Sequence, residues 1–118
     1  MIAVIFEVEP AEGQQEAYLE QAAAMRPLVE EIEGFISVER FESLSTPGKL
    51  LSLSYFRDEA AVEEWRRLSD HRAAQAMGRE EIFEDYSIKV TEVLRDYGKL
   101  DRAEAPEDSL DVHDGGGY

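Results

Sequence analysis

The segment from Trp65 to Gln75, which reads WRRLSDHRAAQ, gathers the side chains of this chain that are best suited to chemistry. It places the single tryptophan six residues before one of the two histidines, and Arg72 and Gln75 follow. An imidazole can move a proton near neutral pH, a guanidinium can hold an anion, and an indole can form an apolar wall. The segment therefore indicates either a catalytic edge, with His71 and Arg72 as its active groups, or a core anchor followed by a surface turn.

The helix that must carry this segment favours the second interpretation. Asp58 offers an N-cap for it. Its apolar stripe consists of Ala61, Val62, Trp65 and Leu68. A continuous stripe would point Arg72 into the apolar face, so the pattern predicts a break near Ser69 and a second helical piece after it. Trp65 then anchors the core, and His71 lies close to a helix cap, at the surface or at the rim of a pocket.

Alternating and helical patterns also organise the rest of the chain. Residues 2–8 alternate as a strand, and from about residue 14 an apolar stripe predicts a helix that ends at Gly34, with a kink or a second short helix at Pro27. Residues 35–41 and 50–56 are typical of two strands joined by a hairpin. A last strand is expected from Tyr86 to Tyr97. This order predicts an α+β ferredoxin-like βαββαβ sandwich, an antiparallel four-stranded sheet with both helices on one face.

The other face of this sheet has no helix to cover it. The strands are nevertheless apolar on both sides, with Ile5, Leu51 and Leu53 on one set of alternating positions and Leu50 and Phe56 on the other. Such a face would expose a larger apolar patch than a monomer normally carries. We therefore expect a homodimer that packs sheet against sheet.

Composition limits the classes of partner. The 118 residues fit one domain, and 12 Lys and Arg against 27 Asp and Glu give a net charge of −15. This charge repels nucleic acid and anionic membranes at long range, so we expect a small hydrophobic or aromatic molecule or a second copy of the chain as partner. There is no cysteine and there are only two histidines. Neither a disulfide nor a metal site is expected.

The two ends of the sequence differ in character. The opening MIAVIFEVEP is apolar but short and lacks a basic leader, so we expect neither a signal peptide nor a membrane span, and a cytoplasmic protein. Residues 99–118 are acidic and end in glycines before the last tyrosine. They predict a flexible tail that follows one domain over residues 1–98.

Three segments resemble a known family. The runs GFISVERFES, LLSLSYFRDEAAVEEWR and HRAAQAMGREEIFEDYSIKV, in this order, are similar to the antibiotic biosynthesis monooxygenase family of dimeric α/β barrels, over roughly residues 1–97. The resemblance implies two ferredoxin-like subunits packed sheet to sheet, each with a pocket between its helices and its sheet. Members include cofactor-free oxygenases of aromatic polyketides, quinol oxygenases and haem-degrading monooxygenases.

The haem-degrading members provide a positional test. They use an asparagine on the first strand, a tryptophan on the second helix and an iron-binding histidine ten residues later. Trp65 matches, but Gln75 stands at the histidine position and Phe6 at the asparagine position. An amide is a poor substitute for imidazole on iron, so the sequence disfavours a haem enzyme. His71 lies one helical turn before Gln75 and is the alternative iron ligand.

The resemblance therefore implies a monooxygenase that needs no cofactor and acts on an aromatic or quinol-like molecule. Once deprotonated, such a substrate can itself reduce dioxygen, so the pocket need only exclude water, hold the ring and stabilise the anion. We expect His71 as the base and Arg72 as the cation. The substrate-binding residues are expected to be Trp65, Gln75, Phe6 and Tyr86. The alternative is a non-catalytic dimeric module that binds small molecules or serves a stress response.

Overall fold

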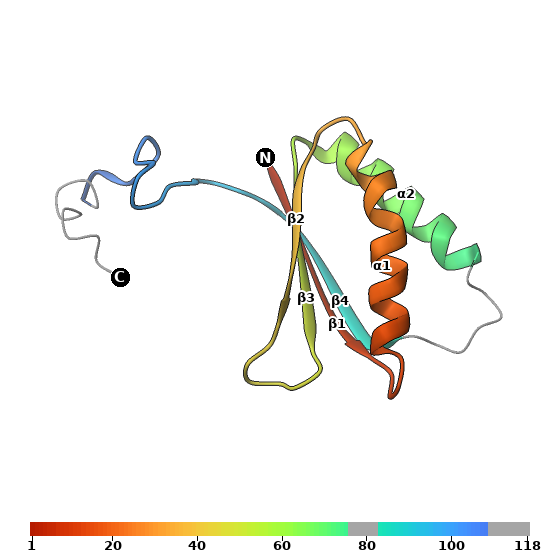
Figure 1. Ribbon diagram of the computed structural model, residues 1–118. Coiled ribbons are helices and arrows are strands. Elements are labelled where there is room, and N and C mark those ends of the chain that lie inside the picture. The colour runs from red at the N-terminus through yellow and green to blue at the C-terminus, as the bar shows by residue number, and fades with distance from the viewer. Residues whose placement is uncertain (76–82, 109–118) are drawn as a thin grey trace.

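Six elements form the fold. The computed structural model describes residues 1–75 and 83–108, apart from the side chains of residues 71–75. The elements are β1 (Ile2–Pro10), α1 (Gln15–Glu30), β2 (Phe35–Glu42), β3 (Leu50–Phe56), α2 (Glu59–Gln75) and β4 (Phe83–Glu92). Both helices lie on the same face of the sheet (Figure 1). The predicted βαββαβ order and the ferredoxin-like α+β class are confirmed.

The sheet is antiparallel throughout and has the order β2-β3-β1-β4. Its register aligns residues in rows that cross all four strands. In one row Arg40 is opposite Ser52, which is opposite Phe6, which in turn is opposite Ile88. Residues directly opposite each other point to the same face of the sheet. All four members of a row therefore lie either on the helix side or on the helix-free side.

The core lies between the helices and the even-numbered residues of β1. Val4 is fully buried and Val8 is 1% exposed, which shows that this side of the central strand is the interior. Around Val4 the strands pack against α1 and α2 in a cluster of Ile2, Val4, Val29, Ile32, Phe56, Ala61 and Val62. A second cluster of Val8, Tyr18 and Leu50 lies toward the other end of the sheet.

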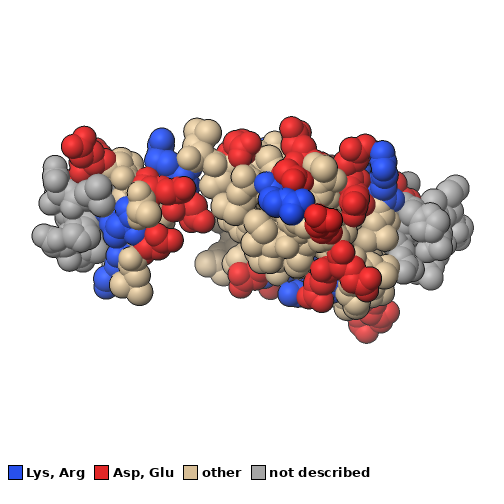
Figure 2. Space-filling model, turned by 90° about the horizontal axis from the view of Figure 1, so that it is seen from above, with Lys and Arg blue, Asp and Glu red and all other residues tan. Residues whose placement is uncertain are grey.

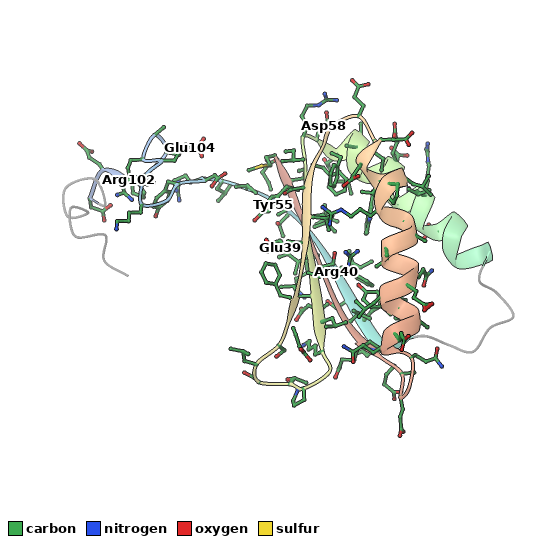
Figure 3. All side chains as sticks on the ribbon, viewed as in Figure 1. Glu39, Arg40, Tyr55, Asp58, Arg102 and Glu104 are labelled. Atoms are coloured by element: carbon green, nitrogen blue, oxygen red, sulfur yellow. The ribbon has the colours of Figure 1, made fainter. Side chains whose placement is uncertain are left out.

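Strand β3 turns its serines toward the helices and its central leucines away from them. Ser52 and Ser54 face the helices and are buried, at 7% and 5% exposure. Leu51 and Leu53 lie on the opposite, helix-free face, together with Tyr55, whose side chain points away from the helices in Figure 3. Strand β3 is therefore apolar on its uncovered side and carries two hydroxyls toward the interior.

Helix α2 begins as expected but does not break. The Asp58 carboxylate accepts a hydrogen bond from the Ala61 backbone N–H at 3.0 Å, so the predicted N-cap is confirmed. The break predicted near Ser69 is wrong, because one helix runs from Glu59 to Gln75. Asp70 lies within this helix and pairs with Arg66 one turn earlier, at 3.7 Å. The end of α2 projects away from β2 and β3 (Figure 1), so the helix can continue without entering the core.

Helix α1 continues through Pro27, so the second short helix is wrong. The proline sits close to the helix end, where the lost backbone donor interrupts little of the remaining helix. The chain then turns through Gly34, whose φ of +96° suits glycine, and whose carbonyl accepts the Arg57 N–H at 2.7 Å.

Strand β4 is shorter than predicted at its C-terminal end. Within the described part of the chain it pairs with β1, where Glu92 is opposite Ile2 and the Val93 N–H binds the Met1 carbonyl. No residue of β1 remains to pair with residues 94–97, so their assignment to the strand is wrong. From there the chain leaves the sheet as an arm (Figure 1), and the division at residue 98 into a domain and a flexible tail stays a prediction.

Acidic side chains are spread over the molecular surface seen in Figure 2, with fewer basic ones between them. This distribution agrees with the net charge of −15. Among the described residues, no helix is long and apolar enough to cross a membrane.

Candidate functional site

Four aromatic rings from three elements meet near one end of the sheet. They are Phe6 on β1, Tyr18 on α1, and Phe83 and Tyr86 on β4, and we call them the aromatic cluster. The Phe6 ring centroid lies 6.4 Å from that of Tyr18 and 5.9 Å from that of Tyr86. The Tyr18 and Phe83 rings meet edge to face at 5.8 Å. Tilted and edge-to-face contacts of this kind can extend to an aromatic ligand.

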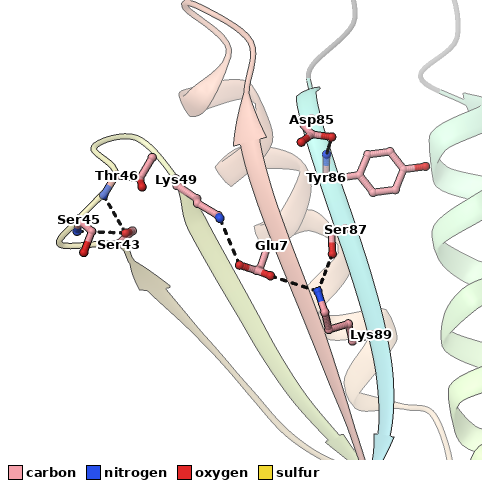
Figure 4. A network of polar contacts seen from close by, with 9 residues as sticks. All are labelled: Glu7, Ser43, Ser45, Thr46, Lys49, Asp85, Tyr86, Ser87 and Lys89. Atoms are coloured by element: carbon pink, nitrogen blue, oxygen red, sulfur yellow. Dashed lines mark hydrogen bonds and ion pairs between the residues drawn. The ribbon is translucent and has the colours of Figure 1, made fainter.

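The aromatic cluster is open along β4. Tyr86, Ile88 and Val90 are on the helix side of β4, opposite the interior residues of β1, yet they are 56%, 45% and 50% exposed. Helix α1 packs on β2, and α2 packs on β1 and β3. The Tyr86 side chain projects toward α2 (Figure 4). An apolar surface with a phenol hydroxyl therefore borders the space between β4 and α2.

Two of the predicted substrate-binding residues, Phe6 and Tyr86, are neighbours in this cluster. Trp65 is not part of it. Its ring lies 6.3 Å from that of Phe56 and packs against the first core cluster. Phe56 and Leu50 mark the two ends of β3, so Trp65 contacts the end of the sheet remote from Tyr86, about 20 Å away along the strand. These contacts favour packing as the main role of Trp65.

The other predicted residues lie on the last turns of α2. His71, Arg72 and Gln75 belong to its helical backbone, but their side chains lie outside the described part of the structure. Helix α2 runs antiparallel to β3, so its C-terminal turns return toward the end of the sheet that carries Tyr86 (Figure 1). The roles of the three residues stay predictions.

A polar group that was not predicted from the sequence lies on the same interior face. Arg40 on β2 is half-buried and lies opposite Ser52, and Figure 3 shows its side chain on the side of β2 that faces α1. Its Nε is buried and has no hydrogen-bond partner within the described residues. The alternation of Val38 and Arg40 along β2 was the available signal. A register shift between Phe35 and Ser37 obscured which side that alternation faces.

A separate ionic network lies on the helix-free face. Glu7 binds the ammonium groups of Lys49 at 3.2 Å and Lys89 at 3.5 Å, and Lys89 also donates to Ser87 (Figure 4). The hydrogen bond and charge of Lys49, and then the charge of Lys89, hold the pKa of Glu7 below its usual value of 4.5. A carboxylate stabilised in its charged form is unsuited to be a general base near neutral pH.

No cluster of three or more His, Cys, Asp or Glu side chains that could hold a metal ion occurs among the residues that the structure describes. The described side chains on the helix side of the sheet at this site are aromatic rings, the hydroxyls of Ser52 and Ser54, and Arg40.

Comparison with known proteins identifies relatives over most of the chain. Residues 1–77 match the family described as antibiotic biosynthesis monooxygenase. The jasmonate monooxygenase ABM of Pyricularia oryzae is 45% identical over 93 residues, which is 79% of this chain but 43% of that protein. This chain thus spans less than half the length of that relative. The uncharacterised protein YqjZ of Bacillus subtilis is 32% identical, with 79% of each chain covered.

Solved structures show the same fold. The Mycobacterium tuberculosis protein Rv0793 superposes with a TM-score of 0.68, covering 80% of this chain and 96% of its own. Its sequence is 23% identical, so the likeness concerns the fold alone.

Proposed function

This chain belongs to the antibiotic biosynthesis monooxygenase family, and on that premise we propose that it is a monooxygenase acting on an aromatic or quinol-like small molecule without a bound cofactor. The observation that carries the proposal is the aromatic cluster, which is built on the helix side of the sheet and open along β4. A planar substrate can stack on these rings and so add a further ring contact to the aromatic cluster.

The proposed reaction needs electrons only from the substrate. A deprotonated phenol or quinol passes an electron to dioxygen, and the two radicals combine to a carbon-bound hydroperoxide. Loss of water from that carbon leaves one oxygen atom in a carbonyl product and the other in water. We assign proton removal to His71 and charge stabilisation to Arg72. The chain's aromatic cluster holds the ring of the substrate in place.

Oxygen uptake over a panel of anthrones, naphthols and quinols tests this proposal. Jasmonate joins the panel because the 45% identical relative is named jasmonate monooxygenase. Turnover should fall in His71→Ala, Arg72→Ala and Tyr86→Ala. Tyr97→Ala is the matched control, since Tyr97 lies on the C-terminal arm, where it contacts Arg102. Uptake at the buffer rate for every compound, or rates unchanged in all three site variants, contradicts the mechanism and favours the non-catalytic binding module.

We also propose that the working unit is a homodimer formed across the helix-free face. Leu51, Leu53 and Tyr55 are only half-buried there, and Phe41 and Ile36 are 42% and 50% exposed. Burial of such a patch against a second copy removes apolar surface from water. Light scattering after size exclusion should give twice the 13.4 kDa of the chain. Leu53→Asp should halve the measured mass, whereas Leu44→Asp, at a fully exposed hairpin position, should not.

Haemin titration separates this proposal from the haem-degrading alternative. With Gln75 at the predicted ligand position, we expect no saturable change in the visible spectrum of haemin. A one-to-one shift that His71→Ala abolishes, followed by haem decay under ascorbate, would replace the cofactor-free mechanism by a haem-dependent one.

A further inference from the structure

We propose that Arg40 is the anion-binding group of the helix-facing site and that it selects an apolar small molecule bearing a carboxylate. This inference rests on the proposed function, because it names the substrate class of the same site. It starts from the buried Nε of Arg40, which has no hydrogen-bond partner in the described part of the chain.

The missing partner contrasts with several arginines at the surface of this chain, which has 27 Asp and Glu against 12 Lys and Arg. Arg26, Arg57 and Arg67 are exposed, and each has a carboxylate oxygen within 3.0 Å. An ion pair at the surface contributes little, whereas a buried N–H donor without a hydrogen-bond partner is unfavourable. The Nε–H of Arg40 is such a donor, and no described carboxylate pairs with it. An anion from outside the chain would satisfy this requirement.

The neighbours of Arg40 suit a carboxylate. Ser52 lies directly opposite on β3, and Ser54 is the next residue on the same side of that strand. Both serines are buried, and none of the hydrogen bonds within the described residues uses their hydroxyls. A guanidinium presents its donors in a planar fork that matches the two oxygens of a carboxylate, and each hydroxyl can donate one further hydrogen bond.

The residues in the same row as Arg40 indicate the length and the polarity of the rest of the ligand. The same row continues from Ser52 to Phe6 and then to Ile88. Two strand spacings separate Arg40 from Phe6, which is about 10 Å between their Cα atoms. A ligand that reaches from one to the other has an anionic end at Arg40 and an apolar or aromatic body on the aromatic cluster.

Because the net charge is −15, a carboxylate is recognised by direct contact with Arg40 and not by long-range attraction to the protein. The net charge slows the approach of any anion through long-range repulsion. The fork of Arg40 acts only at contact, so it distinguishes a carboxylate ligand from the neutral form of the same molecule. The comparison of an acid with its ester is therefore the sharpest probe.

Calorimetric titration of the full chain with 2-naphthoate and with methyl 2-naphthoate tests the inference. The wild type should bind the acid at least about tenfold more tightly than the ester, as expected for charge-assisted hydrogen bonds. Arg40→Met should remove this preference and leave ester binding unchanged. Arg40→Lys, which keeps the charge but not the fork, should retain part of it. Arg26→Met is the control on α1, an exposed arginine paired with Glu30, and should keep the full preference.

Thermal unfolding of the same variants adds a second readout. Because Arg40→Met removes an unpaired cation and keeps most of the apolar stem, its melting temperature should equal or exceed that of the wild type. If this variant fails to fold, Arg40→Gln and the wild-type comparison of acid with ester still decide the question.

Three results would overturn the inference: equal binding of acid and ester by the wild type, an unchanged preference in Arg40→Met, or no binding of either compound. These results are distinct from failure of the proposed function. Acid-selective binding without oxygen uptake leaves the Arg40 site and removes the monooxygenase. Oxygen uptake by a wild type that binds acid and ester equally leaves the monooxygenase and removes the Arg40 site.

Discussion

Trp65 lies against Phe56, with their ring centroids 6.3 Å apart, at the end of β3 opposite to the aromatic cluster. Phe56 is fully buried, and Trp65 joins α2 to the core around it. Trp65→Ala should therefore lower the free energy of unfolding by about 3–5 kcal/mol. Trp65→Phe should lose much less, because a ring can still meet Phe56. Denaturant titration measures both, and a loss in Trp65→Ala as small as that in Trp65→Phe contradicts the role as anchor.

The aromatic cluster should behave in the opposite way. Tyr86 is 56% exposed, so Tyr86→Ala should change stability little but weaken binding of an aromatic probe such as 2-naphthol. Tyr86→Phe keeps the ring and should bind nearly as well as the wild type, unless the hydroxyl contacts the ligand. Fluorescence titration measures the affinities. Unchanged binding in Tyr86→Ala would place the ligand elsewhere.

Asp58→Ala should destabilise α2 by removing its N-cap, and the melting temperature should fall by a few degrees. The Ala61 N–H, and then the Arg57 guanidinium, hold the pKa of Asp58 below its usual 3.8. A carboxyl whose pKa is lower in the folded state stabilises above its unfolded pKa and loses this effect as pH falls. Melting curves of both proteins should therefore differ at pH 7 and converge in strong acid. Asp58→Asn, which can still cap, is the control.

Glu7 should show a related pH dependence on the other face of the sheet. Its pKa is held below 4.5 by Lys49 and then by Lys89, so its contribution is fully present above that value and declines as pH falls through the lower, folded-state pKa. Glu7→Gln should be less stable than the wild type at neutral pH, and the difference should vanish in acid. High salt should reduce it too. A stability difference independent of both pH and salt would contradict the ionic origin.

Much of the fold follows from patterns that neighbouring residues define. The alternation in residues 2–8, the N-cap at Asp58 and the stripe through Trp65 identify β1 and α2, because side-chain period and capping are local properties. The predicted break in α2 is wrong because the prediction placed the whole helix on the sheet, whereas its C-terminal end projects away from β2 and β3. The extension of β4 failed because the length of a strand depends on its partner, and β1 begins at Ile2.

Local sequence patterns predicted only part of the candidate site. Phe6 and Tyr86 were predicted to bind substrate, and they meet diagonally across β1 and β4 although they lie 80 positions apart in the sequence. Trp65 was predicted to join them, but it packs at the remote end of the sheet. Arg40 was not identified, because the register shift between Phe35 and Ser37 hides which face of the Val38 and Arg40 alternation is the interior.

The sequence by itself determined the element order, the excess of negative charge and the family, since these depend on residue types and on their spacing along one chain. Only the tertiary structure decided which side of β3 is the inside. Its alternation defines two faces, one with Ser52 and Ser54 and one with Leu51 and Leu53, and hydrophobicity alone assigns the leucines to the core. The helices instead cover the serines. Side-chain period distinguishes the two faces of a strand, but the packing of distant helices determines which of them is buried.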